Sequence, residues 1–431
     1  MSTKWFIVYA AVFGAMYIGK RLRYKPKYMF IPPFLIGFLP FYGLEGLAIN
    51  PITEPSYRGD SRGFEVTIID ILAVVLAVAF AKKPKVKAPL FGVTVAYLLV
   101  CWFSWFMAAY SDYALWSAWK SLRAYFLAVV LTKALRDTVI ARWLIRGLAV
   151  GLIYVTFICL KQRYVEGLHQ IYGTFHHQNT LGMAVYLVAP IFFSIMLMRP
   201  AGPLNSLALG CGAVVAVLSL SRGVMMVYPA TMGMVYFGSL TWKITPRKIM
   251  VGFAALICLG GVMAKSLDSI VARFTNAPKA SERARERFEH ASALMLDDKP
   301  MGIGMNNFSA VLEGSNYAYR ANIRGYDSTG LVHNIYWLTL AELGYLGLIT
   351  YVLVTFLPIL MALKWAWLGR GDLRAQVILA GGAALLGMAI HGKLEWIARQ
   401  TVPMYLFWIL VALIFSFSRQ IKRKVPFQEF A

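Results

Sequence analysis

Apolar runs long enough to cross a lipid bilayer recur along the whole of this chain, and they constrain its fold more than any other feature. A transmembrane helix needs about 17–25 apolar residues, and it satisfies its own backbone polar groups where no water is present. Only 15% of the residues are charged, whereas soluble domains carry roughly 25%. The sequence therefore predicts an all-α, polytopic transmembrane helical bundle.

Hydropathy predicts about 12–13 spans within a single integral membrane domain, residues 1–431. The run that begins at Trp5 is interpreted as a first span and not as a removed signal peptide, because it lacks a small-residue cleavage site. The expected spans are 4–18, 28–47, 65–82, 90–110, 115–132, 141–160, 181–198, 204–220, 224–241, 249–265, 334–363, 376–392 and 402–418.

Clusters of lysine and arginine alternate with loops of a different kind. Basic clusters such as 20–25, 82–87 and 419–424 mark cytoplasmic loops. The remaining loops then face outward and hold aromatics, glycines, histidines and isolated arginines. They are 48–64, 111–114, 161–180, 221–223, 266–333 and 393–401.

The net charge of +23 raises the question of nucleic-acid binding. Most of the basic residues flank apolar segments, where they fix topology and meet anionic lipid headgroups. No zinc-finger, helix-turn-helix or RNA-binding pattern is present. The lipid bilayer is therefore an expected partner, and nucleic acid is not.

His333 and Asn334 stand where the long loop 266–333 meets an apolar segment. Histidine is the natural proton acceptor at neutral pH, so His333 is a candidate general base. The structural alternative is a hydrogen-bonded histidine at a helix start. Asn334 could orient the ring or a substrate hydroxyl. Glu342 follows two turns into the span, as a supporting partner or a structural carboxyl.

Isolated arginines outside the basic clusters are candidates for binding an anion. Arg222 separates two apolar segments with almost no loop, and an arginine at membrane depth is costly and usually functional. Its structural alternative is a charged helix cap. Arg283, Arg285 and Arg287 alternate with glutamates, which also fits a solvated helix with internal ion pairs. At least one of them is expected to grip phosphate oxygens.

The segment 175–179, Phe-His-His-Gln-Asn, is a further candidate. His176 and His177 could ligate a metal, but no HExxH motif or carboxylate cluster accompanies them. They are expected instead to contact a glycan or a loop. The glycine turn 302–308 lacks the strand and the Lys-Ser/Thr of a nucleotide site, so it is expected to hold the loop against the membrane.

On these residues the chain resembles the O-antigen ligase and polymerase superfamily of bacterial envelope glycosyltransferases, most clearly over 170–350. The ligase signature is His, then Asn, Ser or Gln, nine residues, and GxxG. It is met by His333, Asn334, Gly344 and Gly347. A second pattern, Arg-x9-Met-x4-Pro-x-Gly-x-Gly, is similar to the stretch that starts at Arg285. The remaining matches are Arg222, like the family's arginine in a short periplasmic loop, and 175–179, like a segment of polymerase-like members.

The resemblance implies a GT-C-like, metal-independent glycosyltransferase in the bacterial inner membrane. Its active site faces the periplasm, and 266–333 is its large periplasmic loop. The donor is an undecaprenyl-pyrophosphate-linked glycan and no cofactor is needed. The acceptor is another glycan or lipid A–core, and envelope polysaccharide export proteins join the expected partners. The implied catalytic residues are His333, Arg222 and Arg285, and the substrate-binding residues are Arg287, Arg283, Asn334, His176, His177 and Asn179.

Three functions remain open on the sequence. An O-antigen or exopolysaccharide polymerase is favoured. A ligase that joins the glycan to lipid A–core uses the same chemistry and differs only in its acceptor. A lipid-linked glycan transporter or flippase would also have many spans, but it would place polar residues near the midplane and show repeated halves, which this sequence lacks.

Overall fold

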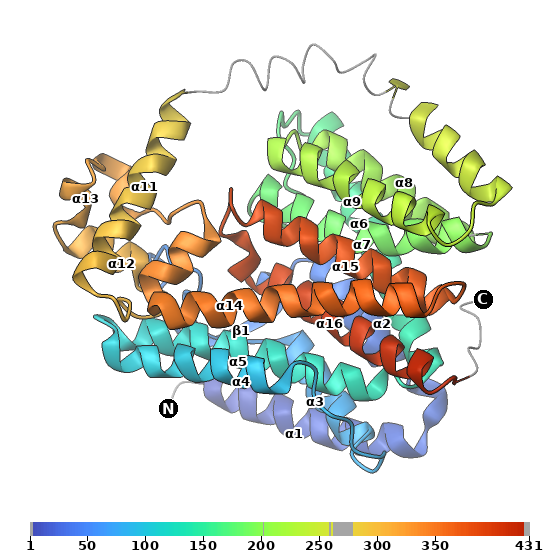
Figure 1. The fold of residues 1–431 in the computed structure, drawn as a ribbon. Coiled ribbons are helices and arrows are strands. Elements are labelled where there is room, and N and C mark those ends of the chain that lie inside the picture. Colours follow the sequence, from blue (N-terminus) through green and yellow to red (C-terminus); the bar gives the residue numbers. More distant parts are fainter. Residues whose placement is uncertain (1–2, 201, 258–259, 262–278, 426–431) are drawn as a thin grey trace.

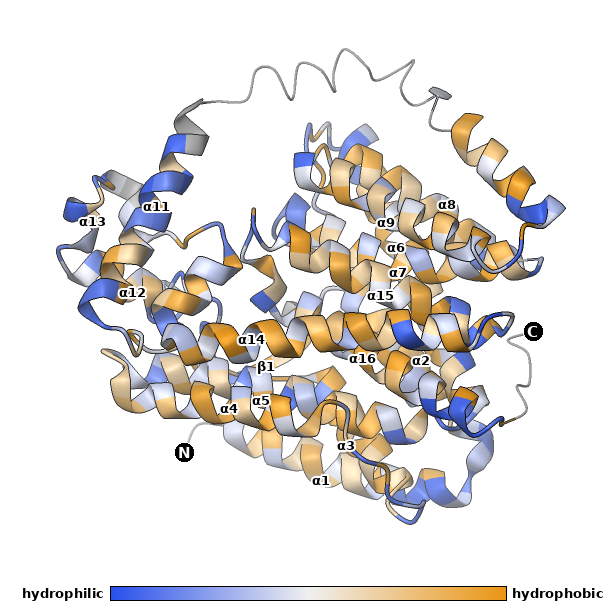
Figure 2. Cartoon of the chain, viewed as in Figure 1, coloured by the Kyte–Doolittle hydropathy of each residue, from blue (hydrophilic) through white to orange (hydrophobic). Residues whose placement is uncertain are grey.

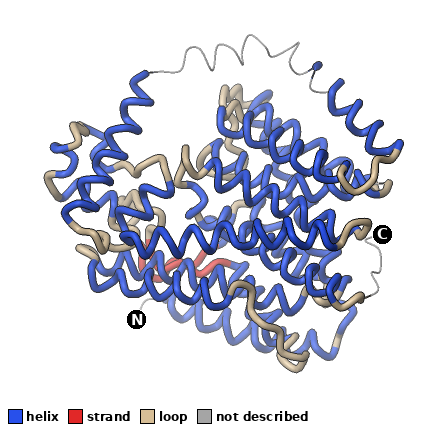
Figure 3. The backbone as a smooth tube through the Cα atoms, in the orientation of Figure 1, coloured by secondary structure: helices blue, strands red, loops and turns tan. Residues whose placement is uncertain are grey.

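A computed structural model describes residues 3–200, 202–257, 260–261 and 279–425. Helices make up most of that part (Figures 1 and 3), so the predicted helical class is confirmed. The described part also contains one feature that the sequence did not predict, a two-stranded antiparallel sheet formed by β1 (Ala48–Thr53) and β2 (Gly63–Thr67). Its register shifts next to Pro51, which has no backbone N–H to donate to the ladder.

Among the elements up to residue 257, helices that are distant in sequence pack on one another, as do neighbouring helices. Helix α1 packs on α3, α2 on α6, and α7 on both α8 and α9. A further helical stretch covers 246–257. The bounds are α1 Thr3–Tyr24, α2 Ile31–Phe38, α3 Ile68–Ala79, α4 Phe91–Phe103, α5 Ser111–Ala134, α6 Thr138–Tyr164, α7 Gln178–Met198, α8 Pro203–Leu218 and α9 Arg222–Leu240.

The C-terminal elements complete the bundle. Helix α15 lies against α7, α9, α14 and α16, and α16 packs on α5, so the last helices close the fold around the middle of the chain (Figure 1). Short 3-10 turns, η5 and η6, precede α14 and α16. The bounds are α11 Lys279–Asp298, α12 Phe308–Gly314, α13 Tyr317–Arg320, η5 Gly325–Thr329, α14 Ile335–Leu368, α15 Leu373–His391, η6 Ile397–Arg399 and α16 Thr401–Lys422.

Six helices of the described part are long and apolar enough to cross a membrane: α6, α7, α9, α14, α15 and α16. Each coincides with a predicted span. Helices α3, α4 and α8 are apolar but shorter. Helices α1 and α5 occupy the predicted spans 4–18 and 115–132, and α5 carries charged side chains along its length. The chain is therefore a multi-pass helical membrane protein.

Two predicted spans are not continuous helices. Over 28–47, α2 stops at Phe38 and only short 3-10 turns follow, where Pro40 cannot donate a helical hydrogen bond. Over 65–82, β2 continues to Thr67, which then caps α3 in a reciprocal capping box with Asp70. The predicted span 249–265 lies partly outside the described residues.

The described part of the long loop, 279–333, folds into helices with an apolar core of their own. Helix α11 is amphipathic, as the sequence predicts from Phe288 onward, and it buries Phe288 and Met295. These side chains pack with Phe308 and Leu312 of α12 and with Leu338 of α14. Hydrophilic residues concentrate on the outer faces of α11 and α13, whereas the bundle helices are mainly apolar (Figure 2).

Helix α14 is broken at Gly344, and the glycine turn of the long loop binds at this break. Gly344 has φ 64° and ψ −166°, a conformation that L-residues avoid. The break frees the carbonyls of Ala341 and Glu342, which accept hydrogen bonds from the N–H groups of Ile303 (3.0 Å) and Gly304 (3.0 Å). The turn thus fastens the loop to the start of α14, the position of His333 and Asn334.

Candidate active site

The loops that the basic clusters predict to face outward meet at one end of the bundle. Asn306 of the long loop donates to the carbonyls of Ser61 (2.8 Å) and Tyr113 (3.0 Å). At a second junction, Ser221 donates to Asn179 (2.7 Å), and Asn179 donates to Glu395 (2.7 Å). Residues from 48–64, 111–114, 161–180, 221–223, 266–333 and 393–401 are therefore joined by direct hydrogen bonds.

His333 is held by a carboxylate that sequence reasoning missed. Its Nδ1 lies 3.0 Å from Oε2 of Glu395, on the connection between α15 and η6. Because an ionised carboxylate only accepts, Nδ1 carries the proton and Nε2 keeps its lone pair. The imidazole is 43% exposed, whereas the Glu395 side chain is only 6% exposed. The arrangement presents an oriented, accessible proton acceptor.

Glu395 contacts three other residues of the site. Its Oε1 accepts from Asn179 and lies 3.6 Å from Nη2 of Arg285, so one buried carboxylate contacts a histidine, an amide and a guanidinium. Burial raises the pKa of Glu395, but the hydrogen bond from His333 and the surrounding positive charges lower it more. The net pKa lies below its ordinary value, and Glu395 is anionic at neutral pH.

Helix α11 presents Arg285 to the site, and the three candidate arginines are not equivalent. Arg285 is 36% exposed and faces Glu395, whereas Arg283 and Arg287 are exposed on the helix surface. One turn after Arg285, Glu289 accepts a hydrogen bond from Asn334 (2.8 Å). This bond fixes α11 against the start of α14.

Asn334 links helices α11 and α14 through hydrogen bonds. Its Oδ1 caps α14 by accepting from the N–H groups of Tyr336 (3.1 Å) and Trp337 (3.4 Å), while its Nδ2 binds Glu289. An N-cap of this type is worth about 0.5–2 kcal/mol. Asn334 therefore positions the backbone next to His333, and its role in binding substrate stays a prediction.

Arg222 is the first residue of α9, directly after the N-cap Ser221, whose hydroxyl donates to Asn179. The helix N-terminus carries a partial positive charge, so an arginine there is disfavoured by about 0.3–1 kcal/mol. This argues against the charged-cap alternative. The chain Ser221–Asn179–Glu395 ties the backbone that carries Arg222 to the carboxylate that holds His333.

The segment 175–179 reaches the site through its last residue. Asn179 lies between Ser221 and Glu395, as described above. His177 caps α7, its Nδ1 accepting from the N–H of Asn179 (3.1 Å), and so holds Asn179 in place. His176 is exposed at the surface of the protein. A glycan contact by either histidine stays a prediction.

A second ionic cluster, also missed from the sequence, is buried beside the site. Arg399 of η6 pairs with Asp60 (3.0 Å) and with Glu342 (2.7 Å), and Lys120 of α5 pairs with Asp60 (3.2 Å). Burial raises the pKa of Asp60, but the charges of Arg399 and Lys120 lower it more. Glu342 also accepts from the N–H of Phe308 (3.1 Å), which fits the structural role expected of it.

Charged residues inside a predicted span were the sequence feature that could have indicated this cluster. Lys120 and Arg123 lie inside a predicted span, where charged residues are expensive and need partners. Arg123 pairs with Asp70 (2.6 Å) and with Glu65, and Asp70 accepts from the Tyr405 hydroxyl (2.6 Å). The positive charges therefore predict buried acids, but nothing in the sequence predicts which ones.

Within the described residues, no group of three or more His, Cys, Asp or Glu side chains could hold a metal ion. The positively charged side chain that contacts Glu395 beside His333 is Arg285, and a guanidinium group binds phosphate or carboxylate oxygens through paired N–H donors. The site therefore combines an oriented imidazole, a buried carboxylate and guanidinium groups. Such a set suits transfer chemistry on an anionic substrate.

The fold and the site define a class, a multi-pass helical membrane protein with a histidine–glutamate–arginine site at one end of its bundle. Residues 207–352 match the family model described as O-antigen ligase, over about a third of the chain. The match includes Arg222, Arg285 and His333. It confirms the predicted resemblance to the O-antigen ligase and polymerase superfamily. No curated protein matches the chain significantly.

Proposed function

We propose that this protein is a glycosyltransferase of the bacterial inner membrane that works on the periplasmic face. It moves a glycan from undecaprenyl pyrophosphate to an acceptor hydroxyl without a metal ion. The match to the O-antigen ligase family model supports lipid-linked glycan chemistry in a membrane. The basic clusters face the cytoplasm by the positive-inside rule, which puts the joined loops and the site on the opposite side. The architecture is GT-C-like.

The observation that carries this proposal is the sharing of Glu395. One buried carboxylate holds both the imidazole of His333 and the guanidinium of Arg285. A base and an anion binder are thereby placed side by side, which the reaction requires. The acceptor hydroxyl must lose a proton where the pyrophosphate leaves.

In the reaction, Nε2 of His333 removes the proton from the acceptor hydroxyl, and Glu395 stabilises the imidazolium that forms. The acceptor oxygen bonds to the anomeric carbon of the donor sugar as the bond from that carbon to the phosphate oxygen breaks. Arg285 turns from Glu395 toward the pyrophosphate, and Arg222 binds it from α9. The guanidinium groups stabilise the negative charge on the leaving group, which stays attached to its lipid.

We infer polymerase activity ahead of ligase activity, because 175–179 resembles a segment of polymerase-like members and its Asn179 contacts Glu395. A ligase would use the same base and arginines with lipid A–core as acceptor. Transport of a lipid-linked glycan does not need a base held by a buried carboxylate, so the geometry of His333 disfavours it.

Product analysis in detergent tests these functions. The purified protein is mixed in EDTA with a polyprenyl-pyrophosphate glycan, with and without lipid A–core. A ladder of products without core indicates a polymerase, and a single product that requires core indicates a ligase. No product in either mixture, together with movement of the donor across vesicles, would replace both with a transporter. Activity that returns only with Mg²⁺ or Mn²⁺ would overturn the metal-independent mechanism.

A further inference from the structure

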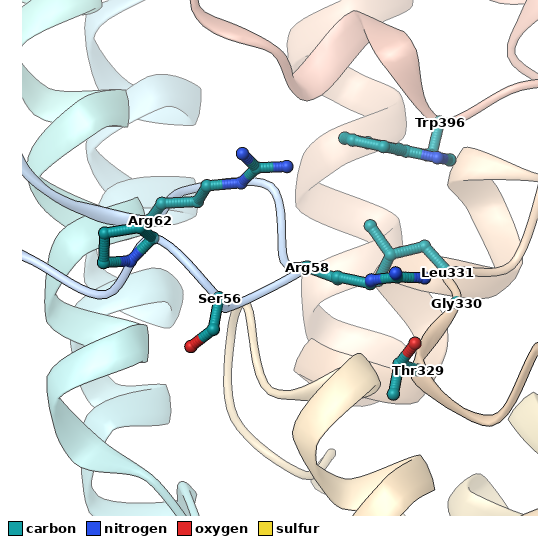
Figure 4. A pocket seen from close by; sticks show the side chains of 8 residues that line it. Ser56, Arg58, Arg62, Thr329, Gly330, Leu331 and Trp396 are labelled. Carbon is teal, nitrogen blue, oxygen red and sulfur yellow. The ribbon is translucent and has the colours of Figure 1, made fainter. Parts of the chain in front are cut away.

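A cavity of about 550 Å³ opens beside the site but is not lined by His333, Arg285 or Arg222. Its walls come from the loop after β1, from the end of the long loop and from the connection before η6. Figure 4 shows Arg62 on one side with Trp396 across from it, and Arg58 extending toward Leu331 and Thr329. Trp396 directly follows Glu395, and Leu331 lies two residues before His333.

The loop that carries the two arginines is anchored through three of its other residues. Tyr57 donates to the carbonyl of Asn306, and Ser61 exchanges hydrogen bonds with the same asparagine (3.2 and 2.8 Å). Asp60 is held by the buried Arg399 and Lys120. These anchors point inward, so Arg58 and Arg62 lie on the side of the loop that faces the cavity (Figure 4).

Gly59 lets this loop pass close to its anchors. A Cβ atom there would collide with the ring of Tyr57 and with the side chain of Asn306. The tight fit fixes the backbone between Arg58 and Arg62. A loop that is rigid before binding loses less conformational entropy when a ligand arrives.

The lining of the cavity specifies the chemistry of its ligand. Among the described residues that line it, two are arginines and none is acidic, and Ser56 and Thr329 add hydroxyl groups. Asp60, between the two arginines, is paired with Arg399 and Lys120, and Glu395, next to Trp396, is paired with His333. Guanidinium groups favour carboxylate or phosphate oxygens, and the flat face of an indole favours the C–H face of a sugar ring.

We propose that this cavity binds an acidic saccharide, a sugar with a carboxylate or phosphate substituent. Arg58 and Arg62 grip the anionic group, and the sugar ring packs on Trp396. The assignment rests on the proposed function in that the saccharide belongs to a glycan that the active site handles. The volume suits about one to two sugar rings, since small-molecule sites span about 300–1,000 Å³.

Binding to the full-length protein in lipid nanodiscs tests the assignment without any transfer step. One probe is an oligosaccharide that contains a uronic acid, and the matched control is the same oligosaccharide with its carboxyl group reduced to an alcohol. A sugar phosphate forms a third arm. The protein carries His333→Ala throughout, so that turnover is strongly slowed. We expect the acidic probes to bind and the reduced one to bind about 10- to 100-fold more weakly.

Variants locate the binding. Arg58→Ala with Arg62→Ala should remove the preference for the acidic probe, and the double lysine variant should restore only part of it. Trp396→Ala should weaken acidic and neutral probes alike, with Trp396→Phe as the partial rescue. Arg324→Ala, an exposed arginine of the same long loop that does not line the cavity, should change nothing.

Equal binding of acidic and reduced probes, or acid preference that survives the double alanine variant, overturns the assignment. Neither result depends on glycan transfer, so the proposed function would be unaffected. With His333 restored, transfer assays distinguish the two sources of the saccharide, which are the acceptor and the donor. One assay pairs an acidic acceptor with a neutral donor, and the other pairs a neutral acceptor with an acidic donor. The double alanine variant should raise KM for whichever substrate carries the acid.

Discussion

Two ionic clusters stand on one short segment of this protein, and they differ in one respect. Glu395 holds His333 and Arg285, which are 43% and 36% exposed. Four residues later, Arg399 is buried between Asp60 and Glu342, and each of these side chains is at most 3% exposed. The clusters use the same kinds of charge. One leaves the partners of its carboxylate accessible to a substrate, and the other encloses its arginine.

The difference shows that the fold uses one set of charged side chains for structural support and another for the reaction. A buried ion pair gains little net stability, but the loss of one partner is costly because it leaves a bare charge. Arg399 therefore fixes the position of the segment 393–401, and Glu395 is part of that segment. Arg399 acts as a positioning residue, whereas His333 and Arg285 can meet the reacting atoms.

The largest expected effect is on the rate, through the accessible cluster. His333→Ala should slow glycan transfer by about 10²–10⁴-fold, because it removes the general base. Thermal unfolding in detergent should change little, since the ring is half-exposed. The matched control is His290→Ala, an exposed histidine of α11. A purified His333→Ala protein with near-normal turnover would erase the distinction between the two clusters.

Substitutions in the buried cluster should lower the stability of the fold. Arg399→Ala should destabilise the fold by about 3–5 kcal/mol, because Asp60 and Glu342 lose their shared cation. Chemical denaturation in detergent measures this, with Arg324→Ala as an exposed control. Arg399→Ala folding as stably as the parent would show that the enclosed charges are not mutually dependent.

A smaller effect should separate the arginines of α11. Arg285→Ala should weaken binding of the pyrophosphate donor by about 1.5–3 kcal/mol, and Arg285→Lys should rescue it poorly because lysine lacks the planar fork. Exposed Arg287→Ala and Arg283→Ala should stay within about 0.5 kcal/mol. Donor titrations of the three variants decide the matter, and equal losses at all three would point to a diffuse basic surface.

The smallest effect concerns pH. The folded-state pKa of Glu395 is lowered from its ordinary value of 4.5, so its ionised form stabilises the fold above that pH. This stabilisation is lost as pH falls below 4.5 through the lower folded-state pKa. The difference in melting temperature between the parent and Glu395→Gln should therefore shrink in that range. Glu313→Gln, at an exposed position, is the control, and a constant difference would rule out an ionised Glu395.

Local patterns in the sequence predicted much of this site. His333, Asn334 and the two glycines were readable because their spacing is short, and Gly344 lies at the break that receives the glycine turn. Alternating basic clusters predicted which loops share one end. The patterns failed where local geometry overrode hydropathy, as at Pro40 and at the capping box of Thr67 and Asp70.

The sequence by itself determined the helical membrane class, the grouping of the loops and the candidate base and arginines. Only the tertiary structure decided which acids serve them and that Arg285 is the arginine turned toward Glu395. The bond from His333 to Glu395 spans 62 residues, that from Asn179 to Glu395 spans 216, and the pair Arg399–Asp60 spans 339. Hydropathy and helical periodicity act over a few turns. Partners this far apart leave no periodic trace in one sequence, because they meet only when the helices pack.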